Sequence, residues 1–233
     1  GFTCFYFAGE LDRPAERCYL VPEAHFTHPD IKDVYIESFN AIGRDRAISK
    51  KIYHLAIKLK DHLYEFVEKF NIQIIIPENA LTIPLNIPLG IALTEFIAET
   101  NIQTIAHHHD FYWERDRFMV NAVQDYLNMA FPPVLPSIHH VVINSVADAQ
   151  LSLRTGVSAR IAPNVMHFEK PPPPPDEYTS DVRQALGIED DELFILQPTR
   201  VVQRKGIEHA IEMVHRLARK AKLIISHASG DEG

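Results

Sequence analysis

The sequence contains few cysteines, no excess of basic residues and no long unbroken apolar segment. Its two cysteines, Cys4 and Cys18, cannot form a disulfide framework, so we expect both to be thiols in a reducing, cytoplasmic environment. The net charge of -8 argues against a nucleic-acid partner, because binding a phosphate backbone requires a concentrated basic surface. The most apolar stretch, residues 83–98, contains two prolines, an asparagine and a glutamate, and it is shorter than the ~20 apolar residues of a membrane-spanning helix. Peripheral membrane contact and homo-oligomer formation stay open.

Glycine-rich nucleotide motifs are also missing. None of the nine glycines belongs to a Gly-x-Gly-x-x-Gly run after an apolar strand, which argues against a dinucleotide-dependent dehydrogenase. The composition is otherwise ordinary for a globular protein, 46% hydrophobic and 23% charged over 233 residues. This length is sufficient for one large domain or two modest ones.

Short apolar runs alternate with helical periodicities along the chain. We expect strands at residues 3–8, 72–76, 102–107, 140–144, 158–162, 193–196 and 223–226, and helices within 31–70, 88–100, 117–129, 145–154, 181–186 and 205–219. Ser145 is expected to cap its helix and Gly156 to end it. Because parallel strands joined by crossover helices produce this alternation, the sequence predicts an α/β fold with parallel sheets.

Five consecutive prolines, residues 171–175, interrupt this pattern. Such a run forms stiff polyproline II and cannot join a sheet, so we expect an interdomain linker at 167–180. It separates an N-terminal domain, 1–166, from the start of a second domain, 181–233. The chain begins just before a predicted strand and stops just after another, and we therefore expect either that the natural protein is longer or that this length of chain depends on a partner.

A histidine run marks the first candidate site. His107, His108 and His109 end a predicted strand, and ligands bind at that edge of open α/β sheets. Strand alternation places His107 and His109 on one face and His108 on the other. Asp110 is a candidate to orient a neighbouring imidazole, and Trp113 a candidate to stack on a sugar. The alternative is one histidine in the core and the others in solvent.

A metal site is a further alternative for the same run. His107 and His109 could ligate zinc together with Asp110 or Glu114, as in a metal-dependent hydrolase. The familiar ligand spacings are missing, however. We therefore expect no metal here.

The second candidate site is the loop between the strand at 193–196 and the next helix. Arg200 and Lys205 lie in this loop, with Arg204 beside them and Gly206 at the helix start. Cations oppose the positive end of a helix, and a bound anion would resolve that conflict. Free N–H groups at the helix start and a glycine that permits close approach suit a diphosphate.

Three further residues have a structural role as their primary interpretation, because they form turns or cap helices. Asn144 and Ser145 end a predicted strand, and Asn164 follows a proline before the linker. They are also candidates for lining a cleft that binds the sugar or the acceptor.

In this order, the segments 104–110, 141–145, 161–168 and 198–211 resemble those of the family 4 retaining glycosyltransferases, or glycosyl transferases group 1, of GT-B fold. The resemblance covers nearly the whole chain. It implies two Rossmann-like domains, the second incomplete here, with the acceptor on the first and a nucleotide sugar on the second. It also implies transfer of a hexosyl group to an acceptor hydroxyl with retention of configuration, without a cofactor or a metal.

The resemblance assigns Arg200 and Lys205 to the donor diphosphate. His109, or His108 if the alignment slips by one residue, would lie near the donor sugar. The family's glycine-rich loop after the first strand and its downstream pair of glutamates have no match here, so we expect little or no activity from this length of chain. A non-catalytic nucleotide- or carbohydrate-binding module is the alternative from another class.

Overall fold

The computed structural model describes residues 1–202 and 205–228. The chain forms two compact units, Gly1–Val165 and Met166–Gly233. The boundary lies at Val165, next to the predicted domain end at residue 166. The predicted linker, 167–180, opens the second unit and contains neither helix nor strand. We describe each unit by itself.

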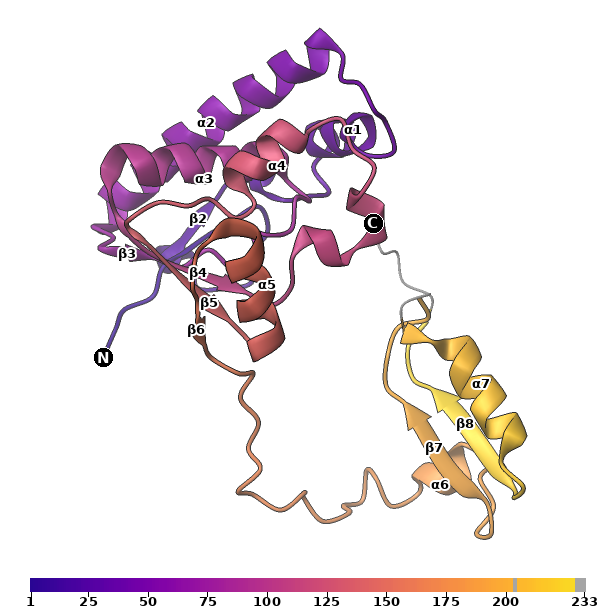
Figure 1. The fold of residues 1–233 in the computed structure, drawn as a ribbon. Coiled ribbons are helices and arrows are strands. Elements are labelled where there is room, and N and C mark those ends of the chain that lie inside the picture. Colours follow the sequence, from indigo (N-terminus) through magenta and orange to yellow (C-terminus); the bar gives the residue numbers. More distant parts are fainter. Residues whose placement is uncertain (203–204, 229–233) are drawn as a thin grey trace. The chain divides into compact units, whose positions relative to one another are not determined.

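The first unit is built on a parallel sheet (Figure 1). Its strands lie side by side in chain order: β3 (Ile74–Ile75), β4 (Gln103–His108), β5 (Ile138–Val142) and β6 (Arg160–Ile161). All the pairings are parallel, which confirms the predicted sheet type. β5 begins and ends two residues earlier than predicted, and at its start the exposed His139 beside Ile138 obscures the apolar pattern.

A smaller sheet pairs β1 (Tyr6–Ala8) with β2 (Cys18–Leu20), also in parallel. The sequence did not predict β2, because three residues are too few to display a strand period. Cys4 and Cys18 are both free thiols, as expected.

Helices cover the main sheet and supply most of the core. The α-helices of the first unit are α1 (Pro29–Ser38), α2 (Arg46–Phe70), α3 (Ile87–Thr100), α4 (Gln124–Ala130) and α5 (Ser145–Thr155). Short 3-10 turns are η1 (Ala15–Arg17), η2 (Pro22–Ala24), η3 (Tyr112–Glu114) and η4 (Asp116–Phe118). α3 packs against α2 and α4, whereas α5 packs against β5 and β6.

Two predicted helices are interrupted. The helical pattern at 31–70 is broken between α1 and α2, and α2 starts anew where the Asp45 side chain accepts from Ala47 N at 2.6 Å. The predicted helix at 117–129 was wrong in its first half. There the Asn121 side chain accepts from Val123 N at 3.0 Å and forms a local turn, so α4 begins only at Gln124.

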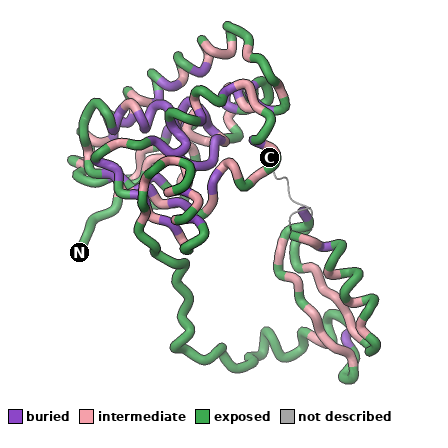
Figure 2. Tube along the Cα trace, viewed as in Figure 1, coloured by how far each residue is buried: buried purple, intermediate pink, exposed green. Residues whose placement is uncertain are grey.

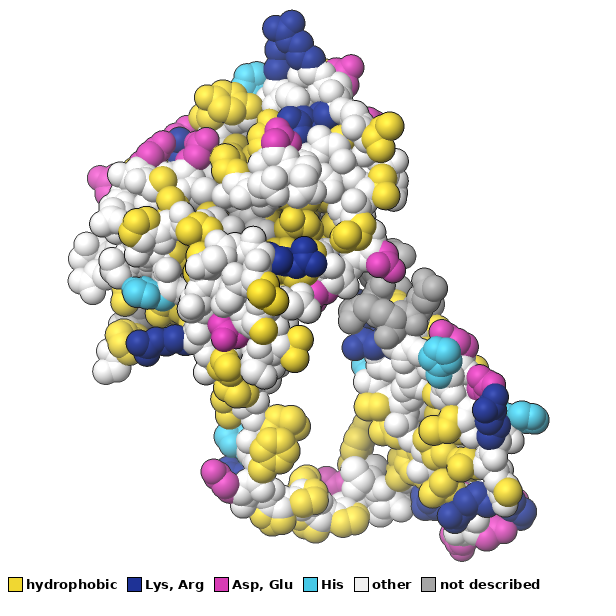
Figure 3. Space-filling view, in the orientation of Figure 1, with side chains coloured by type: hydrophobic (Ala, Val, Ile, Leu, Met, Phe, Trp, Pro, Cys, Tyr) yellow, Lys and Arg dark blue, Asp and Glu magenta, His cyan; other side chains and the backbone are white. Residues whose placement is uncertain are grey.

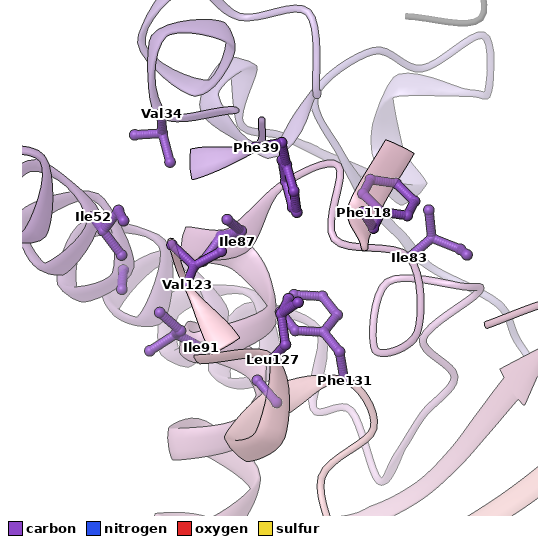
Figure 4. Close-up of a cluster of buried hydrophobic side chains, with 12 residues drawn as sticks. Val34, Phe39, Ile52, Ile83, Ile87, Ile91, Phe118, Val123, Leu127 and Phe131 are labelled. Carbon is purple, nitrogen blue, oxygen red and sulfur yellow. The ribbon is translucent and has the colours of Figure 1, made fainter. Parts of the chain in front are cut away.

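The largest hydrophobic cluster lies among α1, α2, α3 and α4 (Figure 4). Phe118, Phe131 and Ile52 are at most 1% exposed there. Figure 2 shows that buried residues concentrate in the helices and strands of the first unit. The sequence predicted that the apolar residues of α2 recur at helical spacing, at Leu55, Leu59, Leu63, Phe66, Val67 and Phe70. Of these, Leu59, Leu63 and Phe66 are buried. Leu59 and Leu63 belong to a second cluster with α3 and the main sheet, whereas Ile52 and Ala56 of the first cluster were not predicted.

The second unit contains α6 (Val182–Ala185), β7 (Leu193–Gln197), α7 (Ile207–Arg216) and β8 (Ala221–Ile225). β7 and β8 pair in parallel, as expected for a βαβ unit. The predicted helix at 205–219 is shorter at both ends than expected. Few of the described residues in this unit are buried, among them Ile188, Val202 and Ile207.

Positive and negative side chains are interspersed on the face of the molecule in Figure 3.

Among residues 1–202 and 205–228, no helix combines the length and the apolar character needed to cross a membrane.

Candidate active site at the carboxyl edge of the main sheet

The parallel arrangement gathers several predicted residues at one edge of the main sheet. His109 directly follows β4, Asn144 follows β5 and Asn164 follows β6. Glu78 follows β3 at the same edge. Since the carboxyl ends of parallel strands form the ligand-binding edge of open α/β sheets, this edge is the candidate site.

His107 of β4 and His109, the first residue after β4, lie on the same side, as alternation predicted, and their ring centroids lie 4.7 Å apart. Glu78, which the sequence reasoning missed, is their neighbour. Its two carboxylate oxygens lie 2.9 and 3.0 Å from His107 Nδ1, and Oε2 lies 3.6 Å from His109 Nε2. The available signal was its place two residues after the predicted strand at 72–76, at the carboxyl end of that strand.

Backbone and side-chain hydrogen bonds join the Glu78 segment to the end of β4. His107 N donates to Pro77 O at 3.1 Å, and Asn79 N donates to His107 O at 3.0 Å. The Asn79 side chain accepts from His109 N at 2.8 Å. Asn79 adopts a left-handed conformation with φ of 54°, which asparagine tolerates better than most residues. Glu78 is thereby held opposite the two imidazoles.

His108 does not line a cleft, in contrast to the prediction. Its side chain is fully buried and packs beside Phe111, with ring centroids 5.6 Å apart. Its Nε2 lies 2.9 Å from Nδ1 of His140, which is 3% exposed. The physical reason is alternation: the face of β4 opposite His107 and His109 packs into the core. Of the two alternatives for the sugar-side histidine, His109 is therefore the accessible one.

The buried histidine pair is neutral. Burial, reinforced by neighbouring imidazoles, lowers the pKa of His108 to about 3. Burial lowers the pKa of His140 to about 4, against an opposing hydrogen bond to the Pro133 carbonyl. Because a carbonyl only accepts, His140 donates to it, and its Nδ1 then accepts from His108 Nε2–H. His108 Nδ1, which has no hydrogen-bond partner, is left with a lone pair.

This pair predicts a loss of stability in mild acid. Both folded pKa values lie below the ~6.5 of an unfolded histidine, so the unfolded chain binds more protons as the pH falls below that value. Each histidine should remove up to about 1.4 kcal/mol per pH unit between pH ~6.5 and its folded pKa. Urea unfolding at pH 7 and pH 5 measures the effect. Protonation of the His108 ring near pH 6.5 in the folded protein, seen by NMR, would contradict it.

Asp110 does not orient an imidazole. Its Oδ2 is paired with the Arg115 guanidinium, including Nε at 3.1 Å, and no hydrogen bond to a histidine is found among the described residues. Glu114, the other carboxylate considered for zinc, accepts from Phe111 N at 2.8 Å instead. The loop after β4 turns away from the strand at residue 110, and short-range hydrogen bonds within it engage both carboxylates.

Trp113 is a packing residue and is not a free stacking platform. Its ring stacks on Phe111 with centroids 4.5 Å apart, and the Arg154 guanidinium lies 5.0 Å from its ring centroid. Its Nε1 donates to Gln150 at 2.8 Å. These contacts fix the loop after β4 against α5, so the prediction that Trp113 stacks on a sugar is not supported.

Asn144, and not Ser145, caps α5. The Asn144 side chain accepts from Ala147 N at 2.8 Å, and Ser145 is the first helical residue. Gly156 ends the helix in a left-handed conformation, as predicted. Asn144, Ser145 and Asn164 are exposed at the sheet edge, and their roles toward a ligand stay predictions.

The predicted diphosphate loop lies in the second unit, between β7 and α7. Arg200 and Lys205 are both exposed, and no partner for either side chain is found among the described residues. Gln197 Nε2 donates to the Lys205 carbonyl at 2.8 Å, which anchors the loop to the end of β7. Gly206 has φ of 61° and directly precedes α7, a position that favours glycine. Arg204 lies outside the described residues.

Comparison with known proteins relates the chain to sugar-transferring enzymes. No family model matches it. The chain is 35% identical to a mannosylglucosylglycerate synthase of Petrotoga mobilis, over 72% of this chain and 39% of the relative. It is 33% identical to a mannosylglucosylglycerate synthase of Thermotoga maritima, over 84% of this chain and 45% of the relative. A mannosylglucosyl-3-phosphoglycerate synthase of P. mobilis is 28% identical over 58% of this chain and 28% of its own length.

The chain thus spans less than half the length of the curated relatives that it matches. These relatives support a glycosyltransferase, and the parallel α/β architecture fits a Rossmann-like fold of such an enzyme. They give no support to the alternative of a metal-dependent hydrolase.

Proposed function

We propose that the protein containing this chain transfers a hexosyl group from a nucleotide-diphosphate sugar to an acceptor hydroxyl, with retention of configuration. The observation that carries this proposal is the similarity to two synthases of a mannosylated product over 72% and 84% of the chain. In the proposed GT-B arrangement, the first unit binds the acceptor and the second unit binds the donor.

The predicted diphosphate loop is proposed to assist the departure of the nucleotide from the sugar. As the bond between the anomeric carbon and the diphosphate oxygen breaks, negative charge grows on the leaving nucleotide. Arg200 and Lys205 are exposed cations without a partner in the described residues, and they stabilise that charge without a metal ion. The acceptor oxygen bonds to the same face of the sugar, and its proton passes to the departing diphosphate.

Residues at the carboxyl edge of the main sheet are proposed to position the sugar and the acceptor. His109 is accessible, with 39% of its side chain exposed, and it is proposed to hold a sugar hydroxyl near the reactive carbon. Asn144 and Asn164 are exposed at the same edge and are proposed to contact the acceptor or the sugar. Asp110 acts through the Arg115 pair that shapes this loop and takes no direct part.

The proposal is tested with the protein at its natural length. The product name of the two relatives makes a mannosyl donor with glucosylglycerate the first pair to assay, followed by other nucleotide sugars. We expect a new glycosidic bond whose NMR signals show the anomeric configuration of the donor. An inverted product would exclude the front-face mechanism. Thermal stabilisation by nucleotide sugars without any transfer would favour the binding module instead.

A further inference from the structure

Glu78, His107 and His109 bring one carboxylate and two imidazoles together at the carboxyl edge of the main sheet. Their ligand atoms all lie within 4.8 Å of one another, and no other such group occurs in residues 1–202 and 205–228. The geometry points to a binding site for one transition-metal ion of the zinc class. All three residues belong to the first unit, and the site shares His109 with the proposed sugar transfer.

The separations between the ligand atoms suit such an ion. Zinc binds nitrogen and oxygen ligands at about 2.0–2.2 Å, so two ligands of one tetrahedral ion lie roughly 3.4 Å apart. Glu78 Oε2 lies 3.6 Å from His109 Nε2 and 3.0 Å from His107 Nδ1. The two imidazole nitrogens lie within 4.8 Å of each other, so the rings need to approach by at most about 1.4 Å to place the three atoms around one metal.

The cluster is also arranged in advance by the backbone. The three hydrogen bonds that join Pro77 and Asn79 to His107 and His109 hold Glu78 across from both rings. The rings of His107, in β4, and His109, directly after it, are already in contact, so no loop closure is required to bring the imidazoles together. A site held on rigid elements loses less entropy on binding than a site assembled from mobile side chains.

The ligand types select the class of ion. Imidazole nitrogens suit zinc, copper, iron and nickel, whereas magnesium and calcium prefer a shell of oxygens. Two histidines and one carboxylate leave a fourth position open, as in zinc sites that also bind a water or a substrate. The side chains of His107, His109 and Glu78 are 23%, 39% and 60% exposed, so an ion reaches them from solvent.

The test uses this chain and the metal alone, because a sugar ligand would compete for His109. After removal of metal with a chelator, titration calorimetry with Zn²⁺ is expected to show one ion per chain, and Mg²⁺ no binding. Co²⁺ is expected to give visible absorption of a four-coordinate site. His107→Ala, His109→Ala and Glu78→Gln should each weaken Zn²⁺ binding at least tenfold and abolish the cobalt spectrum.

The matched control is His54→Ala, which removes an exposed histidine of α2 far from the cluster in sequence and should leave zinc affinity unchanged. Circular dichroism of the metal-free variants shows whether each one folds. If the folded His109→Ala and Glu78→Gln variants bind Zn²⁺ as the unaltered chain does, or if the unaltered chain binds none, the metal site is excluded. Asn79→Gly, which keeps the left-handed backbone but removes the bond to His109 N, should weaken binding without removing a ligand.

Discussion

Replacement of Lys205 or Arg200 with alanine is expected to lower turnover of the natural-length protein by roughly 30- to 1,000-fold. This corresponds to about 2–4 kcal/mol of lost transition-state stabilisation per contact. The physical reason is that each exposed cation meets charge that grows on the departing diphosphate, beside the start of α7. Steady-state rates with saturating donor and acceptor measure the loss, and the donor affinity is measured separately.

Lys220→Ala is the matched control for charge. Lys220 is an exposed lysine of the same unit, but its side chain pairs with Asp191 at 2.9 Å and its carbonyl accepts from Leu193 N. Lys220 thus lies at the amino ends of β7 and β8, at the edge of this sheet opposite the predicted diphosphate loop. We expect the turnover of the Lys220→Ala variant to stay within about twofold of that of the unaltered enzyme. Near-normal rates for both Lys205→Ala and Arg200→Ala would end the proposed mechanism.

Phe131→Ala is expected to destabilise the first unit by about 3–5 kcal/mol. The Phe131 side chain is 1% exposed in the cluster among α1, α2, α3 and α4 (Figure 4). Its ring lies directly on Gly90 of α3, since a Cβ added at Gly90 would be 2.2 Å from the ring's Cζ. Truncation therefore removes buried apolar surface and leaves a cavity that rigid helices do not fill. Urea unfolding followed by the fluorescence of Trp113, the single tryptophan, reports on this unit.

Phe168→Ala supplies the comparison for the core variant. Phe168 is 85% exposed, so the same change of side chain removes no packing. The free energy of unfolding of the Phe168→Ala variant should stay within about 0.5 kcal/mol of that of the unaltered chain. Equal losses in the two variants would show that the ring of Phe131 is not part of a close-packed core.

The parallel α/β architecture was predictable because its signals are local. Each apolar run, helix period and capping residue reflects the neighbours of that residue along the chain. α3 was predicted to within one residue, and Gly156 ends α5 as expected, although the cap of α5 is one residue earlier than predicted. Alternation along β4 also separated His107 and His109 from His108 correctly.

The short β2 and the break between α1 and α2 were not predictable from the same signals. Three residues show no strand period, and a helix boundary depends on which capping residue finds a donor. His139 had a similar effect at the start of β5, since an exposed histidine beside Ile138 hides the beginning of the strand in a hydropathy pattern.

Residue types and their order along the chain were sufficient to predict a parallel sheet, to locate the histidine run at a strand end, and to place two cations before a helix. Tertiary structure alone decided the partners of those residues. Glu78 meets the two imidazoles because β3 pairs with β4, and Trp113 contacts Gln150 and Arg154 because the loop after β4 packs on α5. Sequence patterns record the period of one element, whereas such partners depend on which elements become neighbours when the core closes.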